Sequence, residues 1–101
     1  MVVTVVLGTY TAPEADVVAG LPAHLVFLEE LLADGRLLTG GRNVPGDGSV
    51  LVLHGVEPND ALAVLAPDPY VTSGVVRYEV AGAFLPGMLA PGLAEVLGDA
   101  S

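Results

Sequence analysis

Two segments of this chain would be apolar on both faces as β-strands, and this property limits the possible folds more than any other. Residues 1–10 (MVVTVVLGTY) and residues 50–56 (VLVLHGV) are rich in β-branched side chains. A strand of this kind needs cover on both faces. We therefore expect a sheet with neither face left bare.

A helix is expected between these two strands. Pro22 favours a helix that begins at Leu21–Pro22, because proline is tolerated at the first helical position and poorly inside. Residues 11–20 are then a loop that has room for one helical turn. The helix should stop at Gly35. Its buried stripe follows three- and four-residue spacing and comprises Leu21, His24, Leu25, Leu28, Leu31 and Leu32.

The rest of the chain supplies two more strands and a second helix. We expect short strands over residues 36–43 and 74–85, the latter with one wetter face. Turn residues occupy 44–49, and a short helix over 57–66 ends at the prolines of residues 67–70. One weak helical turn is expected around Leu93–Leu97.

This β-α-β-β-α-β order predicts an α+β, ferredoxin-like fold, with an antiparallel four-stranded sheet and two helices on one face. Residues 1–86 would form this domain and residues 87–101 a C-terminal tail. Two helices cover only one face, and an exposed apolar face is a liability. We therefore expect a homodimer in which two sheets face each other as a barrel-like core.

Composition excludes several classes of function. The 101 residues carry twelve acidic side chains, three arginines and no lysine, for a net charge of −9. Such a charge disfavours nucleic acid and anionic membrane surfaces as partners. The absence of cysteine removes disulfides, thiolate nucleophiles and Cys-based metal sites. No segment is typical of a membrane span or signal peptide, so we expect a cytoplasmic protein.

His24 and Asp68 are the candidates for proton chemistry. His24 would lie in the first turn of its helix, where the free N–H groups and the dipole favour a neutral imidazole that can accept a proton. The alternative is a core histidine bonded to a backbone carbonyl. Asp68 lies between two prolines that stiffen its backbone, although Asp-Pro is also common in turns. A carboxylate beside an imidazole would fix its tautomer, but spacing alone does not bring the two residues together.

Other polar residues give weaker signals. His54 has no HxH or HExxH partner, so we expect no metal site. Tyr10, Tyr70 and Tyr78 could line a pocket or simply fill the core. The two serines at positions 49 and 73 lack the G-x-S-x-G context of a nucleophile. Neither glycine-bearing turn matches a phosphate or dinucleotide motif, so we expect no cofactor.

Three motifs in order carry a family resemblance. They are PAH at the helix start, the GRLLTGG segment, and DPY followed by a glycine and the strand sequence YEV. With them, the chain resembles the YCII-related family of small bacterial proteins from about residue 2 to about residue 84. The resemblance implies a ferredoxin-like fold, dimers of the α+β-barrel type, and an active centre formed by His24 and Asp68.

The resemblance also bears on activity. A characterised relative is a dehydrochlorinase that acts on a chlorinated hydroxyquinol, and similar folds include muconolactone isomerases and cofactor-free monooxygenases of polyketide pathways. We therefore expect a cofactor-independent lyase or isomerase that transfers a proton on a small phenolic, lactone or polyketide-like substrate. The expected ligand contacts are Tyr10, Thr39, Gly40, Tyr70 and Ser73.

Two alternatives to an enzyme remain. A dimeric module could bind a small metabolite without transforming it, which would suit the scarcity of charged groups and the lack of a cofactor motif. A purely structural protein would have no ligand-sized cavity beside His24.

Overall fold

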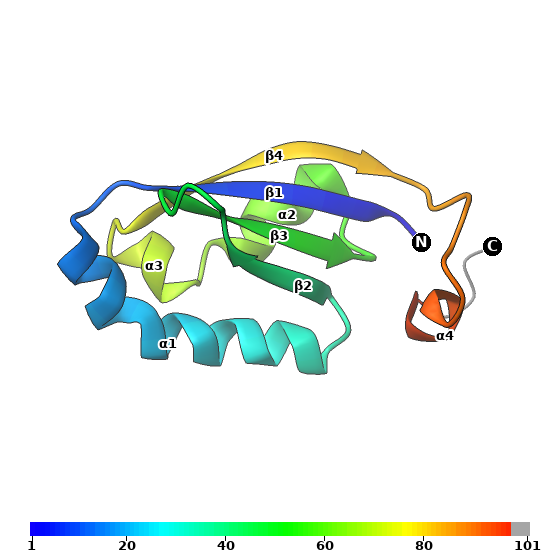
Figure 1. Ribbon diagram of the computed structural model, residues 1–101, viewed down its shortest axis with the longest axis horizontal. Coiled ribbons are helices and arrows are strands. Elements are labelled where there is room, and N and C mark those ends of the chain that lie inside the picture. Colours follow the sequence, from blue (N-terminus) through cyan, green and yellow to red (C-terminus); the bar gives the residue numbers. More distant parts are fainter. Residues whose placement is uncertain (98–101) are drawn as a thin grey trace.

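The computed structural model describes residues 1–97, which form four strands and four helices (Figure 1). The predicted strands and the helix over 57–66 are confirmed, with ends that differ by a few residues. The strands are β1 (Val3–Tyr10), β2 (Leu37–Arg42), β3 (Gly48–His54) and β4 (Val76–Phe84). The helices are α1 (Glu14–Ala33), α2 (Pro58–Leu65), α3 (Pro69–Thr72) and α4 (Leu93–Leu97).

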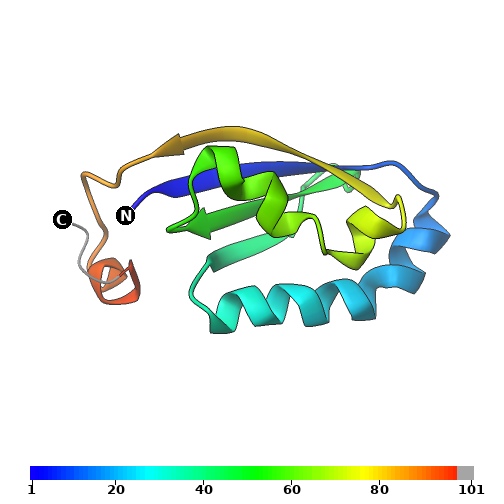
Figure 2. The same cartoon turned by 180° about the vertical axis from the view of Figure 1, so that it is seen from behind.

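The four strands form one antiparallel sheet in the order β2-β3-β1-β4. Helices α2 and α3 lie behind the strands in Figure 1 and in front of them in the opposite view of Figure 2, so they cover a single face. Helix α1 runs beneath the same sheet beside β2 (Figure 1). The predicted α+β, ferredoxin-like arrangement is therefore confirmed.

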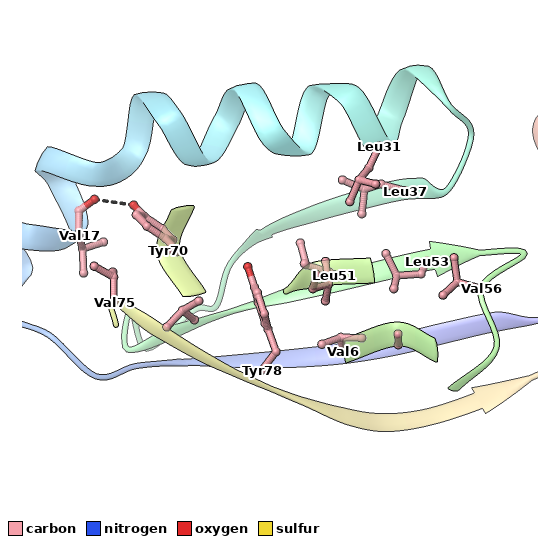
Figure 3. Packing of buried hydrophobic residues seen from close by; sticks show 13 residues of the cluster. Val6, Val17, Leu31, Leu37, Leu51, Leu53, Val56, Tyr70, Val75 and Tyr78 are labelled. Carbon is pink, nitrogen blue, oxygen red and sulfur yellow. Dashed lines mark hydrogen bonds between the residues drawn. The ribbon is translucent and has the colours of Figure 1, made fainter. Parts of the chain in front are cut away.

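The core lies between the helices and the inner face of the sheet (Figure 3). Alternate residues of each strand point inward, as the two-residue period of a strand requires. From the strands, Val6, Leu51, Leu53, Val76 and Tyr78 enter this core. From the helices come Val17, Leu31, Ala61, Leu65 and Tyr70.

The outer face of the sheet is also apolar, as predicted from the two-sided strands. Val5, Val50 and Val52 alternate with the inward residues of β1 and β3 and are only partly buried. Leu7 on the same face is 38% exposed. Among residues 1–97, no helix covers this face in either view (Figures 1 and 2).

The predicted start of the first helix is wrong. Helix α1 begins at Glu14 after Pro13, contains Pro22 inside it, and takes up most of the segment predicted as a loop. An internal proline removes one helical hydrogen bond at a cost of about 3 kcal/mol. Tertiary contacts offset that cost, because Val17 is buried, its carbonyl accepts the Tyr70 hydroxyl, and Glu14 pairs with Arg42. His24 therefore lies well inside the helix, too far from the first turn at Glu14 for the free N–H groups there to act on it.

Two short helices complete the described chain. The PDPY segment does end α2, but it also starts the extra turn α3, which was not predicted. The turn expected around Leu93–Leu97 is confirmed as α4, which lies beyond the end of the sheet (Figure 1). Among residues 1–97, no helix is both long enough and apolar enough to cross a bilayer.

Candidate functional site

His24 and Asp68 are in direct contact. The Nδ1 atom of His24 lies 2.9 Å from both carboxylate oxygens of Asp68. His24 is 7% exposed and Asp68 is fully buried. The alternative of a core histidine bonded to a backbone carbonyl is therefore wrong about the partner, which is a carboxylate.

Asp68 is held by its position at the start of α3. It is the N-cap residue, and its Oδ1 accepts the backbone N–H of Tyr70 at 2.9 Å. Its Oδ2 accepts the hydroxyl of Tyr78, from β4, at 2.7 Å. Asp68 thus starts a turn, as is common for Asp-Pro, and its stiffened carboxylate is also a buried hydrogen-bond acceptor.

These bonds determine the imidazole tautomer. An ionised carboxylate only accepts hydrogen bonds, and Asp68 already receives the N–H of Tyr70 and the O–H of Tyr78. The Nδ1 atom of His24 must therefore carry the proton that points to Asp68. In a neutral imidazole with this tautomer, Nε2 has no proton and can act as a base.

Burial keeps the Tyr78 hydroxyl in its donor form. Removal from water raises the pKa of Tyr78 far above its usual value, and the hydrogen bond to Asp68 raises it further. The neutral hydroxyl therefore keeps donating to Asp68 throughout the neutral pH range. Tyr78 does not line the cavity described below, so its role is to support the carboxylate.

Tyr70 fixes the other side of the imidazole. Its ring stacks on the His24 ring with centroids 4.0 Å apart and planes at 11°. Its hydroxyl donates to the Val17 carbonyl of α1 (Figure 3). Burial raises the pKa of Tyr70, so this hydroxyl also stays neutral. A Cβ atom at Gly20 would lie 2.9 Å from the Tyr70 ring, so only glycine lets the ring pack this closely against the helix.

A cavity of about 240 Å³ opens beside His24, between α1 and the inner face of the sheet. Nε2 of His24 has no hydrogen-bond partner among residues 1–97, although every fully buried side-chain nitrogen and oxygen there has one. Nε2 must therefore reach open space, and the space that His24 lines is this cavity. The helix contributes Val17, Val18, Leu21, Leu25 and Leu28, α3 contributes Tyr70, and the sheet contributes Tyr10, Gly40, Gly41, Arg42, Ser49 and Leu51.

Comparison of the sequence with known families identifies the family of this chain. The model of the YCII-related domain matches residues 3–82, a span that includes both His24 and Asp68. The chain belongs to the YCII-related family. No curated protein matches the sequence significantly.

A solved structure shares this family fold. It is the 5-chloro-2-hydroxyhydroquinone dehydrochlorinase of Burkholderia phenoliruptrix AC1100, in complex with 2,5-dihydroxybenzoquinone. The two chains are 19% identical, with a TM-score of 0.58 over 83% of this chain and 89% of the dehydrochlorinase. At this identity the likeness establishes the fold alone.

Three of the five ligand contacts expected for this YCII-related chain meet at the cavity, namely Tyr10, Gly40 and Tyr70. Thr39 lies away from this cavity, because the pairing of β2 with β3 shifts register between Leu37 and Thr39. The shift places Thr39 opposite Val52 on the outer face and turns Gly40 inward. Ser73 lies at the end of α3, where its hydroxyl donates to the Pro69 carbonyl, and it does not line the cavity.

Sequence reasoning missed two polar residues of the cavity. Ser49 was considered only as a nucleophile, although its alternation with Leu51 and Leu53 along β3 places it on the inner face. Arg42 gave no sequence signal. Its guanidinium lies 5.1 Å from the centre of the Tyr10 ring and bonds both carboxylate oxygens of Glu14, at 3.0 and 2.5 Å. That pairing lowers the pKa of Glu14.

His54 stands apart from this site. It ends β3 on the outer face, whereas His24 faces the cavity on the inner side. Within residues 1–97, no three side chains of the His, Cys, Asp or Glu type lie together where they could hold a metal ion.

Proposed function

We propose that this YCII-related protein is a cofactor-independent enzyme of the lyase or isomerase type, with His24 as general base and Asp68 as its partner. The observation that carries the proposal is the 2.9 Å contact from Nδ1 of His24 to Asp68, with Nε2 left open to a cavity. A base presented in this way needs only an acidic proton within reach to do chemistry.

In the proposed reaction, Nε2 removes a proton from a carbon or hydroxyl of the substrate. The imidazolium that forms lies against the Asp68 carboxylate, which balances its positive charge. The Tyr78 hydroxyl and the Tyr70 N–H hold the carboxylate in place throughout. General acid–base help of this kind contributes about 10²- to 10⁴-fold in rate, which suits a substrate whose proton is already acidic.

The proposed substrate is a small phenolic, lactone or polyketide-like molecule. The cavity is slightly smaller than the roughly 300–1,000 Å³ typical of ligand pockets, so it suits a single ring. Most of its lining is aliphatic or aromatic, which favours a flat, mainly apolar ligand. The dehydrochlorinase with the same fold acts on a chlorinated hydroxyhydroquinone, and we propose the same substrate class here.

We also propose that the protein acts as a homodimer. The outer sheet face presents Val5, Leu7, Val50 and Val52 without any cover from its own helices. Pairing this face with that of a second copy would bury it. All four of these side chains are aliphatic, so none of them would bring a charge into the interface.

The test compares wild type with His24→Gln and with His54→Gln as the matched control. Candidate substrates are 5-chloro-2-hydroxyhydroquinone, a muconolactone and a β-keto aromatic, followed by absorbance and by mass of the products. We expect His24→Gln to lose at least about 100-fold in kcat/KM and His54→Gln to keep wild-type activity. Equal turnover by a folded His24→Gln variant would remove the assignment. Ligands that raise the melting temperature but are recovered unchanged would instead favour the binding module.

A further inference from the structure

Like His24, Ser49 is a nearly buried residue of the cavity with a polar side-chain atom that has no partner among residues 1–97. Its side chain lies on the inner face of β3 and is 9% exposed. The hydroxyl makes no hydrogen bond to any of residues 1–97, whereas every fully buried polar side-chain atom there has a partner. The hydroxyl must therefore reach open space, and Ser49 lines the same cavity as His24.

The surroundings of Ser49 preserve that position. Gly8 of β1 lies directly opposite Ser49 on the neighbouring strand β3. A Cβ atom at Gly8 would lie only 2.6 Å from the Ser49 hydroxyl oxygen and 3.0 Å from the Tyr78 ring. Any larger residue at position 8 would therefore displace the hydroxyl or the tyrosine that supports Asp68. The absence of a side chain at Gly8 keeps both groups in place.

The open polar atoms of these two nearly buried residues lie on different walls of the cavity. Nε2 of His24 comes from α1, and the Ser49 hydroxyl comes from the sheet on which α1 packs. A nearly buried hydroxyl without a partner costs free energy, and a ligand that bonds it recovers that cost. A ligand held at one polar group could rotate, whereas one held at two has a single orientation.

We propose that Ser49 is a substrate-binding residue whose hydroxyl bonds an oxygen substituent of the ligand while His24 faces the reacting proton. The inference deepens the proposed function and rests on it. Where the reacting proton belongs to a hydroxyl, it narrows the ligand to a ring with at least two oxygen substituents. A serine hydroxyl both donates and accepts, so a phenol or a ring carbonyl would satisfy it equally well.

The test uses two pairs of probes in which a methyl group replaces one hydroxyl. Hydroquinone is compared with 4-methylphenol, and resorcinol with 3-methylphenol. Dissociation constants are measured by NMR titration for wild type, Ser49→Ala and Ser73→Ala. Ser73 is the matched control, because its hydroxyl is already bonded to Pro69 and lies outside the cavity. Ser49→Ala removes one oxygen atom and adds no bulk, so the fold should be retained.

We expect wild type and Ser73→Ala to prefer at least one dihydroxy probe over its methyl match by about 3- to 10-fold, and Ser49→Ala to lose that preference. The same preference in Ser49→Ala, or none in wild type, would overturn the Ser49 inference. Neither result touches the general-base proposal, which fails separately if His24→Gln retains turnover. Loss of activity in His24→Gln with an unchanged preference in Ser49→Ala would therefore reject Ser49 alone.

Discussion

The ring of Tyr70 lies almost parallel to the imidazole of His24, with 4.0 Å between centroids. Tyr70 belongs to α3, the same short helix whose N-cap is Asp68. One turn of chain therefore supplies both the hydrogen-bond partner and the stacking partner of His24. The imidazole is restrained along its edge by Asp68 and across its face by Tyr70.

The stacking predicts different effects for two Tyr70 variants. Tyr70→Phe keeps the ring and loses the bond to the Val17 carbonyl, so we expect a loss of about 1 kcal/mol in unfolding free energy and near-normal kcat. Tyr70→Leu loses the ring, and we expect a loss of about 3 kcal/mol and a lower kcat. Denaturant unfolding and steady-state kinetics measure both quantities. Equal kcat for the two variants would show that the stacked ring does not orient His24.

Gly20→Ala should push the Tyr70 ring away from its place. Alanine favours a helix over glycine by about 1 kcal/mol, but its Cβ would lie 2.9 Å from a ring carbon. Overpacking costs about 1–3 kcal/mol, so we expect a net loss of about 1 kcal/mol together with reduced kcat. Gly82→Ala is the control, because a Cβ there meets nothing within 4 Å and Gly82 does not line the cavity. A stabilised and fully active Gly20→Ala variant would contradict this close approach.

Asp68→Asn tests the tautomer. An amide in place of the carboxylate can donate to Nδ1, which would move the imidazole proton to Nε2 and abolish the base. We expect kcat/KM to fall by about 10²- to 10⁴-fold while the protein stays folded. Nitrogen-15 chemical shifts of the imidazole report the protonated nitrogen directly. Asp34→Asn is the control, since Asp34 pairs with Arg36 at the surface.

Tyr78 predicts a loss of stability at alkaline pH. Its pKa is raised in the folded state, so the unfolded chain releases this proton at lower pH, near 10. The stabilisation from the neutral hydroxyl is complete below about pH 10 and declines as the pH rises toward the folded-state pKa. We expect Tyr78→Phe to be less stable than wild type at pH 8 by about 1–2 kcal/mol.

The difference in unfolding free energy between wild type and Tyr78→Phe should shrink from about pH 8 to about pH 11, because the phenylalanine ring of the variant has no proton to lose. Denaturant unfolding at several pH values gives both curves. Parallel curves over this range would mean that the Tyr78 hydroxyl is not held neutral by the fold.

Leu7→Glu tests the proposed dimer. Leu7 lies on the outer sheet face, where a carboxylate would enter the apolar interface directly opposite Glu79 of β4. We expect the dimer dissociation constant to rise by about 100-fold or more, measured by sedimentation equilibrium. Leu62→Glu, at an exposed position of α2, should leave it unchanged. A monomeric wild-type protein would remove the dimer proposal.

The strands were predictable because their signal is local. Runs of β-branched residues define β1 and β3, and two-residue alternation defines β4, without reference to the rest of the chain. The start of α1 was not predictable in this way. Proline rules describe an isolated helix, whereas Pro22 is tolerated through the contacts of Val17 and Glu14 with distant residues.

The site was predictable only through the family resemblance. His24 and Asp68 are 44 positions apart, and no local pattern relates them. Ser49 and Arg42 reach the cavity because they pair across β2 and β3, and that pairing depends on an irregularity of register that composition does not reveal. Residue type made His24 and Asp68 candidates and the family resemblance paired them, but the remainder of the cavity required the three-dimensional sheet.

The register shift in β2 determines which residues form the cavity wall without affecting the contact between His24 and Asp68. If residues 37–42 paired with β3 without this irregularity, the inward and outward positions after Leu37 would exchange. Thr39 and Gly41 would then lie on the side of the sheet that faces His24, and Gly40 and Arg42 would face outward. Loss of the irregularity at unchanged chain length would thus rewrite the cavity wall while His24 and Asp68 stay in place. In the evolution of such chains, a change of register in one edge strand offers a route to new ligands that leaves the contact between His24 and Asp68 intact.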